Sequence, residues 1–115
     1  MLKGSGFDYL ALHRLVAVGL LVFLFATVAF AETGAETYRA HCSACHGVHG
    51  DGDTMLGRNL KLRPLGSAEV QAQMDAELAE IIAKGKGKNR MPAFERKLSK
   101  EQIADLVKFI RSLQK

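Results

Sequence analysis

A run of 17 residues without a charged side chain, residues 15–31, constrains this chain more than any other feature. The segment before it carries Lys3 and Arg14 against a single acid, Asp8. A basic start followed by an apolar stretch is typical of a secretory signal peptide. The run is apolar on every face, which argues against a helix packed in a globular core.

The run ends in Ala29-Phe30-Ala31, a small-residue pattern that signal peptidases cleave. We therefore predict a signal peptide over residues 1–31 and a mature domain over residues 32–115, located in the periplasm or otherwise exported. A membrane-spanning helix needs roughly 20 apolar residues, slightly more than the run provides. A retained membrane anchor is the alternative, and contact with a membrane is expected only in that case.

The composition fits one small globular domain. The chain has 115 residues, of which 48% are apolar and 24% charged. Removing Lys3, Arg14 and Asp8 with the leader leaves 14 basic and 11 acidic side chains. That small excess, without basic runs interleaved with aromatics, argues against nucleic acid as a partner. Two cysteines are too few for a disulfide-rich scaffold, and a domain of this size needs some additional stabilising element.

The mature segment has helical periodicity and no alternating strand pattern. We predict a helix from the N-cap Thr33 to about Ala44, a loop over 47–66, a helix over 67–83 and a last helix starting at Ser99. The apolar positions of the last two helices are Val70, Met74, Leu78, Ile81 and Ile82, and Ile103, Leu106, Val107, Ile110 and Leu113. The predicted fold class is all-α, with three or four helices.

The segment Cys42-Ser43-Ala44-Cys45-His46 is a Cys-x-x-Cys-His motif, the signature of covalent haem attachment. Two cysteines three positions apart near a helix end can reach both vinyl groups of one porphyrin. The adjacent histidine then projects to the iron from the same side. We predict one haem c, held by Cys42 and Cys45, with His46 as an axial ligand. The apolar haem would also supply the additional stabilising element that the size requires.

Three other uses of the two cysteines fit the sequence less well. A thioredoxin-type dithiol needs a βαβ setting, which the helical pattern lacks. A structural zinc site needs four ligands, and beyond the motif only His41 or His49 lies nearby. We expect these two histidines to be solvent-exposed. A disulfide between Cys42 and Cys45 would close a loop too short to stabilise the fold much.

The iron also needs a sixth ligand, and Met91 is the predicted one. Met91 lies in an irregular segment between two helices, and Pro92 restricts its backbone to an extended conformation. Met74 lies on the apolar stripe of its helix, which favours core packing. Met55 follows His46 too closely in sequence to reach the opposite face of a haem.

Several segments, in this order and spacing, resemble the monohaem class I cytochromes c, in particular the small soluble bacterial and photosynthetic type. The segments are YRAHCSACHG (38–47), GDG (50–52), IAKGKG (82–87), MPAF (91–94) and LSKEQI (98–103). The resemblance implies a fold in which the N- and C-terminal helices cross and enclose one haem. It also implies that Cys42 and Cys45 form the thioethers, with His46 as proximal and Met91 as distal ligand.

One segment departs from the family pattern. Where the family has Gly-Pro-Asn-Leu, this chain has Gly57-Arg58-Asn59-Leu60. The family's proline carbonyl accepts a hydrogen bond from Nδ1 of the proximal histidine. Arg58 still offers a backbone carbonyl to orient His46, and Leu60 matches the residue that packs on the haem.

The expected function follows from filled axial positions. A methionine sulfur opposite an imidazole favours ferrous iron, and no position remains for a substrate. We therefore predict an electron carrier rather than an enzyme, a monomer that shuttles one electron at a time between larger redox proteins. The alternatives are a dedicated cytochrome subunit of a dehydrogenase or oxidase complex and, if Met91 dissociates, a haem peroxidase or sensor.

Charged residues near Met91 could contribute to partner binding. The cations that flank it are Lys84, Lys86, Lys88, Arg90 and Lys97. They either form a basic rim that steers acidic partners or simply solvate a loop. The acids Asp75, Glu77 and Glu80 are expected on the solvent face of their helix.

Overall fold

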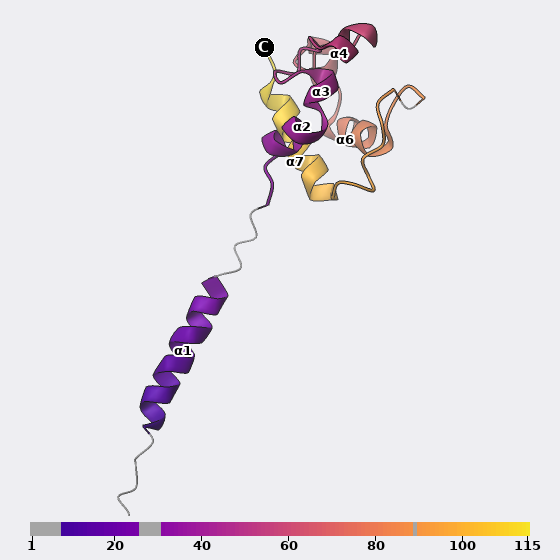
Figure 1. The fold of residues 1–115 in the computed structure, drawn as a ribbon. Coiled ribbons are helices and arrows are strands. Elements are labelled where there is room, and N and C mark those ends of the chain that lie inside the picture. Colours follow the sequence, from indigo (N-terminus) through magenta and orange to yellow (C-terminus); the bar gives the residue numbers. More distant parts are fainter. Residues whose placement is uncertain (1–7, 26–30, 89) are drawn as a thin grey trace, which may run out of the picture. The chain divides into compact units, whose positions relative to one another are not determined.

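In a computed structural model of the protein, residues 8–25, 31–88 and 90–115 are described (Figure 1). The chain divides into two compact units, Met1–Ala31 and Glu32–Lys115. The first contains helix α1 (Tyr9–Phe25). Within the described residues, no helix is long and apolar enough to cross a membrane. Ala29 and Phe30 of the predicted cleavage motif lie outside the described residues, so cleavage stays a prediction.

The second unit is helical, as predicted. Its helices are α2 (Gly34–His41), α3 (Ser43–His46), α4 (Met55–Asn59), α5 (Ala68–Gln71), α6 (Asp75–Lys84) and α7 (Lys100–Ser112). Within the described residues the extended pairing is limited to one isolated antiparallel bridge between Lys86 and Met91. The all-α class is therefore confirmed, with three longer helices and three short ones.

Helices α2 and α7 cross and pack against each other (Figure 1). Both begin with the capping boxes that the sequence predicts, at Thr33 and at Ser99. Gly34 permits the close crossing, because a Cβ there would collide with the backbone carbonyl of Asp105 in α7. Tyr38 of α2 is 2% exposed, and its ring centroid lies 4.7 Å from that of Phe109.

The core forms where α2 and α6 both pack on α7. Its buried members are Tyr38, Val70, Leu78, Ile82, Phe94, Leu98, Ile103, Leu106, Val107 and Ile110. Burying each large apolar side chain contributes about 1.5–3 kcal/mol before the entropic cost of ordering the chain. The core thus fixes α6, and with it the start of the segment that carries Met91.

The prediction of one continuous helix over residues 67–83 is wrong. The chain forms α5, breaks over residues 72–74, and starts again at α6. Met74 is extended at the N-terminus of α6 and 65% exposed, so its predicted core position is also wrong. The backbone N–H of Met74 donates to Glu77 Oε2 at 2.8 Å, which caps the new helix.

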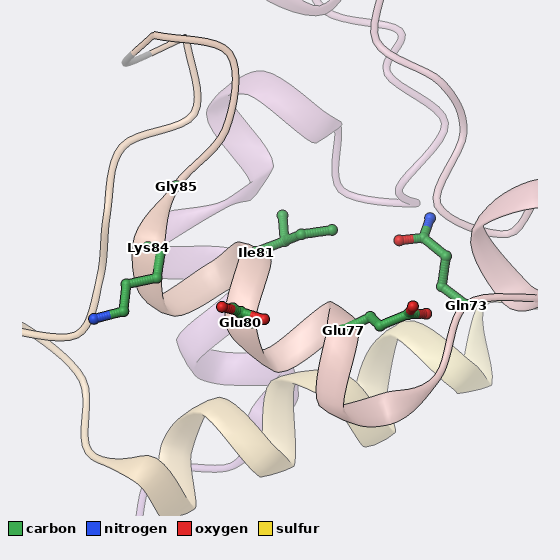
Figure 2. Close-up of a pocket in the computed structure, with 6 residues that line it drawn as sticks. All are labelled: Gln73, Glu77, Glu80, Ile81, Lys84 and Gly85. Atoms are coloured by element: carbon green, nitrogen blue, oxygen red, sulfur yellow. The ribbon is translucent and has the colours of Figure 1, made fainter.

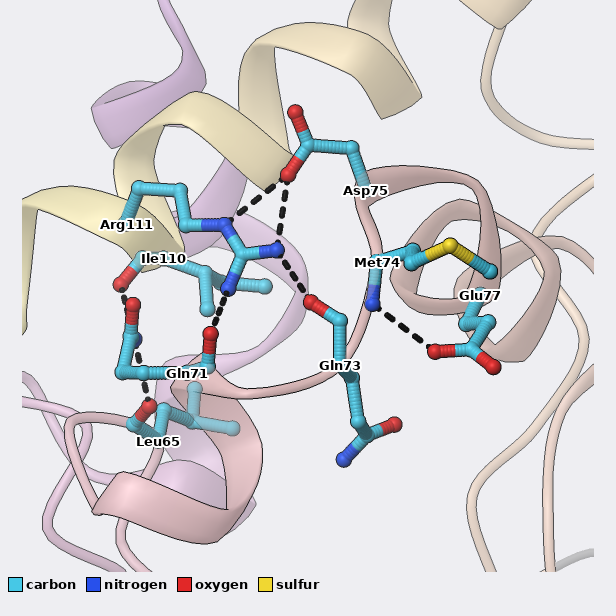
Figure 3. Close-up of polar contacts among 8 residues, drawn as sticks. All are labelled: Leu65, Gln71, Gln73, Met74, Asp75, Glu77, Ile110 and Arg111. Atoms are coloured by element: carbon cyan, nitrogen blue, oxygen red, sulfur yellow. Dashed lines mark hydrogen bonds and ion pairs between the residues drawn. The ribbon is translucent and has the colours of Figure 1, made fainter.

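Side chains from α5 and α7 stabilise this break (Figure 3). The Arg111 guanidinium donates to the carbonyl oxygens of Gln71, at 2.8 Å, and Gln73, at 2.5 Å. It also pairs with the carboxylate of Asp75 at 2.8 Å. The Gln71 amide donates in turn to the carbonyl oxygens of Leu65, at 2.9 Å, and Ile110, at 3.0 Å. In a continuous helix the carbonyls of Gln71 and Gln73 would accept from backbone N–H groups; here they accept from Arg111 of α7 instead.

Candidate functional site

The two cysteines and His46 lie on one helical turn. Helix α2 ends at His41, and Cys42 is both the C-cap of α2 and the N-cap of α3. The sequence alone predicted one continuous helix to about Ala44. The N–H groups of Cys45 and His46 donate to the Cys42 carbonyl oxygen at 3.2 and 2.9 Å. The bend at Cys42 therefore brings all three side chains onto a single tight turn.

Both thiols are free and half-buried. Burial is the main cause that raises the pKa of the Cys42 thiol to about 11, with a smaller contribution from Cys45. Cys42 is therefore protonated at neutral pH and packs against the apolar core. Among the described residues, no group of three or more His, Cys, Asp and Glu side chains could hold a metal ion by itself.

His46 presents a neutral imidazole. Burial lowers the pKa of His46, so the ring is uncharged at neutral pH, the form in which histidine ligates metals. Its Nδ1 atom is buried and has no hydrogen-bond partner. Two free thiols and a neutral imidazole on one turn fit a covalently attached haem with the histidine as ligand.

In this structure His46 Nδ1 has no hydrogen-bond partner, and the hydrogen bond from it to the Arg58 carbonyl stays a prediction. The Arg58 carbonyl accepts from the N–H groups of Leu60 and Lys61, the latter at 3.1 Å. These two amides close the C-terminal end of α4, and Lys61 turns the chain there with a φ of 53°. The Arg58 side chain is exposed and pairs with Asp53.

Helix α4 packs closely against the Cys-x-x-Cys-His motif. The Thr54 hydroxyl donates to the Cys45 carbonyl at 2.8 Å and accepts from the Gly57 N–H at 2.8 Å. A Cβ at Gly57 would collide with the Gly52 carbonyl and lie 2.7 Å from that of Cys45. Leu60, half-buried, ends this helix. Thr54 therefore positions the motif, a role that only its place three residues before Gly57 could have suggested.

A buried hydrogen bond holds Gly47, the residue directly after the motif. The hydroxyl of Tyr38 donates to the carbonyl oxygen of Gly47 at 2.7 Å. Burial raises the pKa of Tyr38 far above its ordinary value, so the phenol stays protonated and remains a donor. The chain just after His46 is therefore bonded to a buried side chain of α2.

Met91 lies on a separate turn that starts at the end of α6. Lys86 and Met91 exchange two backbone hydrogen bonds of 3.0 Å each. Gly85, with a φ of 78°, allows this pairing, because a Cβ there would lie 2.5 Å from the Met91 carbonyl oxygen. Met91 is half-buried and packs against the core, whereas Met55 and Met74 are 74% and 65% exposed. Asn89 lies outside the described residues.

The segment after Met91 returns to the core. The N–H groups of Phe94 and Glu95 each donate at 3.1 Å to carbonyls of α6, those of Ile82 and Ala83. The Phe94 ring lies 6.1 Å from the ring of His41, centroid to centroid. The described contacts thus bring the chain that follows Met91 close to the end of α2, where the motif begins.

An open pocket of about 420 Å³ lies along α6 beside the base of this turn (Figure 2). It is lined by Gln73, Glu77, Glu80, Ile81, Lys84 and Gly85. Figure 2 shows Lys84 and Gly85 at the point where the chain leaves α6. Two carboxylates and an ammonium group line it beside the apolar side chain of Ile81. This pocket differs from the apolar enclosure that a buried ligand needs.

The charged residues around the turn are exposed, as expected. Lys86, Lys88, Arg90 and Lys97 are all exposed, as are the acids Asp75, Glu77 and Glu80. The Lys84 ammonium pairs with Glu95 at 2.6 Å, and the Lys97 ammonium lies 5.9 Å from the Phe94 ring centroid. His41 and His49 are exposed as well.

Comparison with known proteins agrees with this geometry. Residues 29–110 match the sequence family described as cytochrome C oxidase, cbb3-type, subunit III. The chain is 35% identical over 97 residues to cytochrome c6 of Thermosynechococcus vestitus, covering 83% of this chain and 82% of the relative. It is 33% identical over 99 residues to cytochrome c6 of Nostoc, covering 84% and 85%.

A solved structure shares the fold. The c-type cytochrome KustC0563 superposes with a TM-score of 0.66 at 37% sequence identity, covering 72% of this chain and 99% of that one. A tyrosine-to-phenylalanine mutant of the same cytochrome gives a TM-score of 0.62 at 34% identity, covering 70% and 98%.

Proposed function

Since the chain belongs to the cytochrome c family, as a small monohaem class I member, we propose that it is an exported electron carrier whose haem iron is ligated by His46 and Met91. A c-type cytochrome of this kind holds one covalently bound haem c and transfers electrons; it is not an enzyme.

Cys42 and Cys45 are the proposed attachment residues. Each thiol would add across one vinyl group, so that a carbon–sulfur bond forms and the thiol proton passes to the vinyl carbon. No external oxidant is needed for that addition. The half-buried, protonated Cys42 is already packed against the core, which orients it before attachment. Bound haem supplies a one-electron ferric–ferrous couple.

Met91 is the proposed distal ligand, and one observation carries this choice. Of the three methionines considered, Met91 alone packs against the core, on a turn held by backbone hydrogen bonds. His46 contributes a neutral imidazole, and Met91 would contribute a neutral thioether. Sulfur ligation favours the ferrous state and raises the potential relative to two histidines. With both axial positions filled by the chain, small substrates are excluded from the iron.

An absorption spectrum of the haem-loaded protein tests the axial pair. We expect the weak long-wavelength band of methionine-to-ferric charge transfer in the wild type. Met91→Ala should abolish this band, and Met74→Ala, in an exposed methionine near α6, should leave it intact. A wild-type protein that keeps covalent haem but lacks the band would refute Met91 ligation. Loss of the band in Met74→Ala would show that the wrong methionine was chosen.

Export and cleavage can be tested on the same preparation. We expect the exported protein to begin at Glu32, since cleavage is predicted after Ala31. A protein recovered from the membrane fraction with residues 1–31 still attached would support the retained anchor instead.

A dedicated subunit of a larger redox complex is the second candidate. The match to the family described as a subunit of cbb3-type cytochrome c oxidase favours it. A free monomer at native expression levels would favour the mobile carrier, and co-purification with a larger complex would favour the subunit. In either role, exposed cations such as Lys86, Lys88 and Lys97 would attract acidic partners. The electron-transfer rate should then fall as the salt concentration rises, and a rate independent of salt would exclude such steering.

A further inference from the structure

The turn that carries Met91 is fixed at its base. The N–H of Gly85 donates to the Ile81 carbonyl at 2.8 Å, and Lys86 and Met91 pair through two backbone hydrogen bonds. These bonds tie the two ends of the turn to α6 and to each other. They do not connect the outer part of the turn, residues 87, 88 and 90, to the rest of the fold.

Arg90 makes that connection. Its Nη2 atom donates to the carbonyl oxygen of Leu60 at 2.5 Å, across 30 residues of sequence. The aliphatic part of the Arg90 side chain lies over Gly87, where an added Cβ would be 3.4 Å from Arg90 Cδ. Among the described residues of the turn, this is the hydrogen bond that reaches a segment other than α6 and its continuation.

The segment that receives this hydrogen bond belongs to the proximal side of the site. Leu60 ends α4, and the next residues fold back as Leu62 N–H donates to the Gly57 carbonyl at 2.9 Å. Helix α4 itself is bound to the motif through Thr54 and the Cys45 carbonyl. Arg90 therefore connects the turn that carries Met91 to α4, and through α4 to α3, which contains Cys45 and His46.

We propose that Arg90 is a positioning residue that keeps the Met91 thioether on the iron by tying the turn to the Leu60 carbonyl. This inference rests on the proposed ligation by His46 and Met91. Arg90 directly precedes Met91, so any movement of its anchored side chain is passed to the Met91 backbone. A guanidinium suits the task because its long stem spans the distance and its planar head donates in a fixed direction. Losing the hydrogen bond would favour the state in which Met91 has left the iron.

Imidazole binding to the haem-loaded ferric protein tests the proposal, since imidazole can bind only when Met91 leaves. The titration follows the loss of the methionine-to-ferric band in wild type, Arg90→Ala and Lys88→Ala. Lys88 is the matched control, because it is an exposed cation in the same turn and its side chain forms no hydrogen bond in the described structure. Both variants remove one positive charge from the turn that carries Met91.

We expect Arg90→Ala to bind imidazole about three- to tenfold more tightly than Lys88→Ala, the effect of one net hydrogen bond. Chemical unfolding of both variants should remain close to wild type, because neither side chain is buried. Equal imidazole affinities in the two variants, with the band present, would overturn the role of Arg90 and leave the ligation intact. Absence of the band in the wild type would overturn both.

Discussion

Replacing Arg111 by alanine should destabilise the domain far more than an ordinary surface charge change. Arg111 lies on α7, its side chain is 29% exposed, and it is bonded to the break between α5 and α6. The variant removes two donors from the carbonyls of Gln71 and Gln73 and one partner from Asp75. The break is not helical in the folded chain, because Met74 has an extended backbone at the N-terminus of α6.

The expected loss in the free energy of unfolding follows from these contacts. A hydrogen bond to a charged donor is worth about 1.5–3 kcal/mol when well shielded, and partial exposure here reduces this to about 1 kcal/mol each. The Asp75 carboxylate is 75% exposed, so its ion pair adds about 0–0.5 kcal/mol. We therefore expect Arg111→Ala to lower the free energy of unfolding by about 2 kcal/mol.

Denaturant unfolding of the haem-loaded protein measures this change, with Lys108→Ala as the control. Lys108 lies on the same helix and pairs with Asp105, but its side chain is 77% exposed. That variant should lose about 0–0.5 kcal/mol. Asp75→Ala should behave like the control, because the loss in Arg111→Ala comes mainly from the backbone carbonyls. Equal losses in Arg111→Ala and Lys108→Ala would refute the reasoning.

Two further predictions concern α2. Gly34→Ala should lower the free energy of unfolding by about 1–3 kcal/mol in denaturant titrations, because its Cβ must push α2 away from the Asp105 carbonyl; an unchanged stability would show that the crossing is not close-packed. The Thr33 backbone and hydroxyl hold the pKa of Glu36 below its ordinary value. The stabilisation from ionised Glu36 is therefore present above the pKa of the unfolded chain and lost as the pH falls through the lowered pKa of the folded state. Acid titration of stability should show a smaller loss in Glu36→Gln, and an identical loss would contradict the assignment.

Local signals in the sequence predicted much of the fold. The capping boxes at Thr33 and Ser99 are completed by residues three positions away, so both helix starts are visible in a short window. Gly85 ends α6 as expected, since a positive φ there favours glycine. The Cys-x-x-Cys-His motif likewise lies within one turn of chain.

The wrong predictions, one helix over residues 67–83 and a core position for Met74, have a common physical reason. The apolar positions around Met74 keep helical spacing, yet the chain breaks there, and Arg111 bonds the freed carbonyls of Gln71 and Gln73 from 40 and 38 residues away. Met74 was likewise predicted to lie in the core, but it is 65% exposed because its backbone is extended where the chain turns into α6. Contacts of this kind depend on long-range packing or on turn closure, and periodicity within a window contains neither.

The two proposed ligands are held by unequal parts of the fold. His46 lies in a block where α2, α3 and α4 are tied by the buried hydrogen bond of Tyr38 and the part-buried hydrogen bond of Thr54. Met91 depends on a turn with backbone bonds at its base and one exposed arginine at its outer part. Local opening begins where buried contacts are fewest, so the Met91 turn should open at a lower free energy than the His46 block. Exchange of the distal ligand would therefore precede global unfolding, and the strength of the Arg90 contact would set how far the two events are separated.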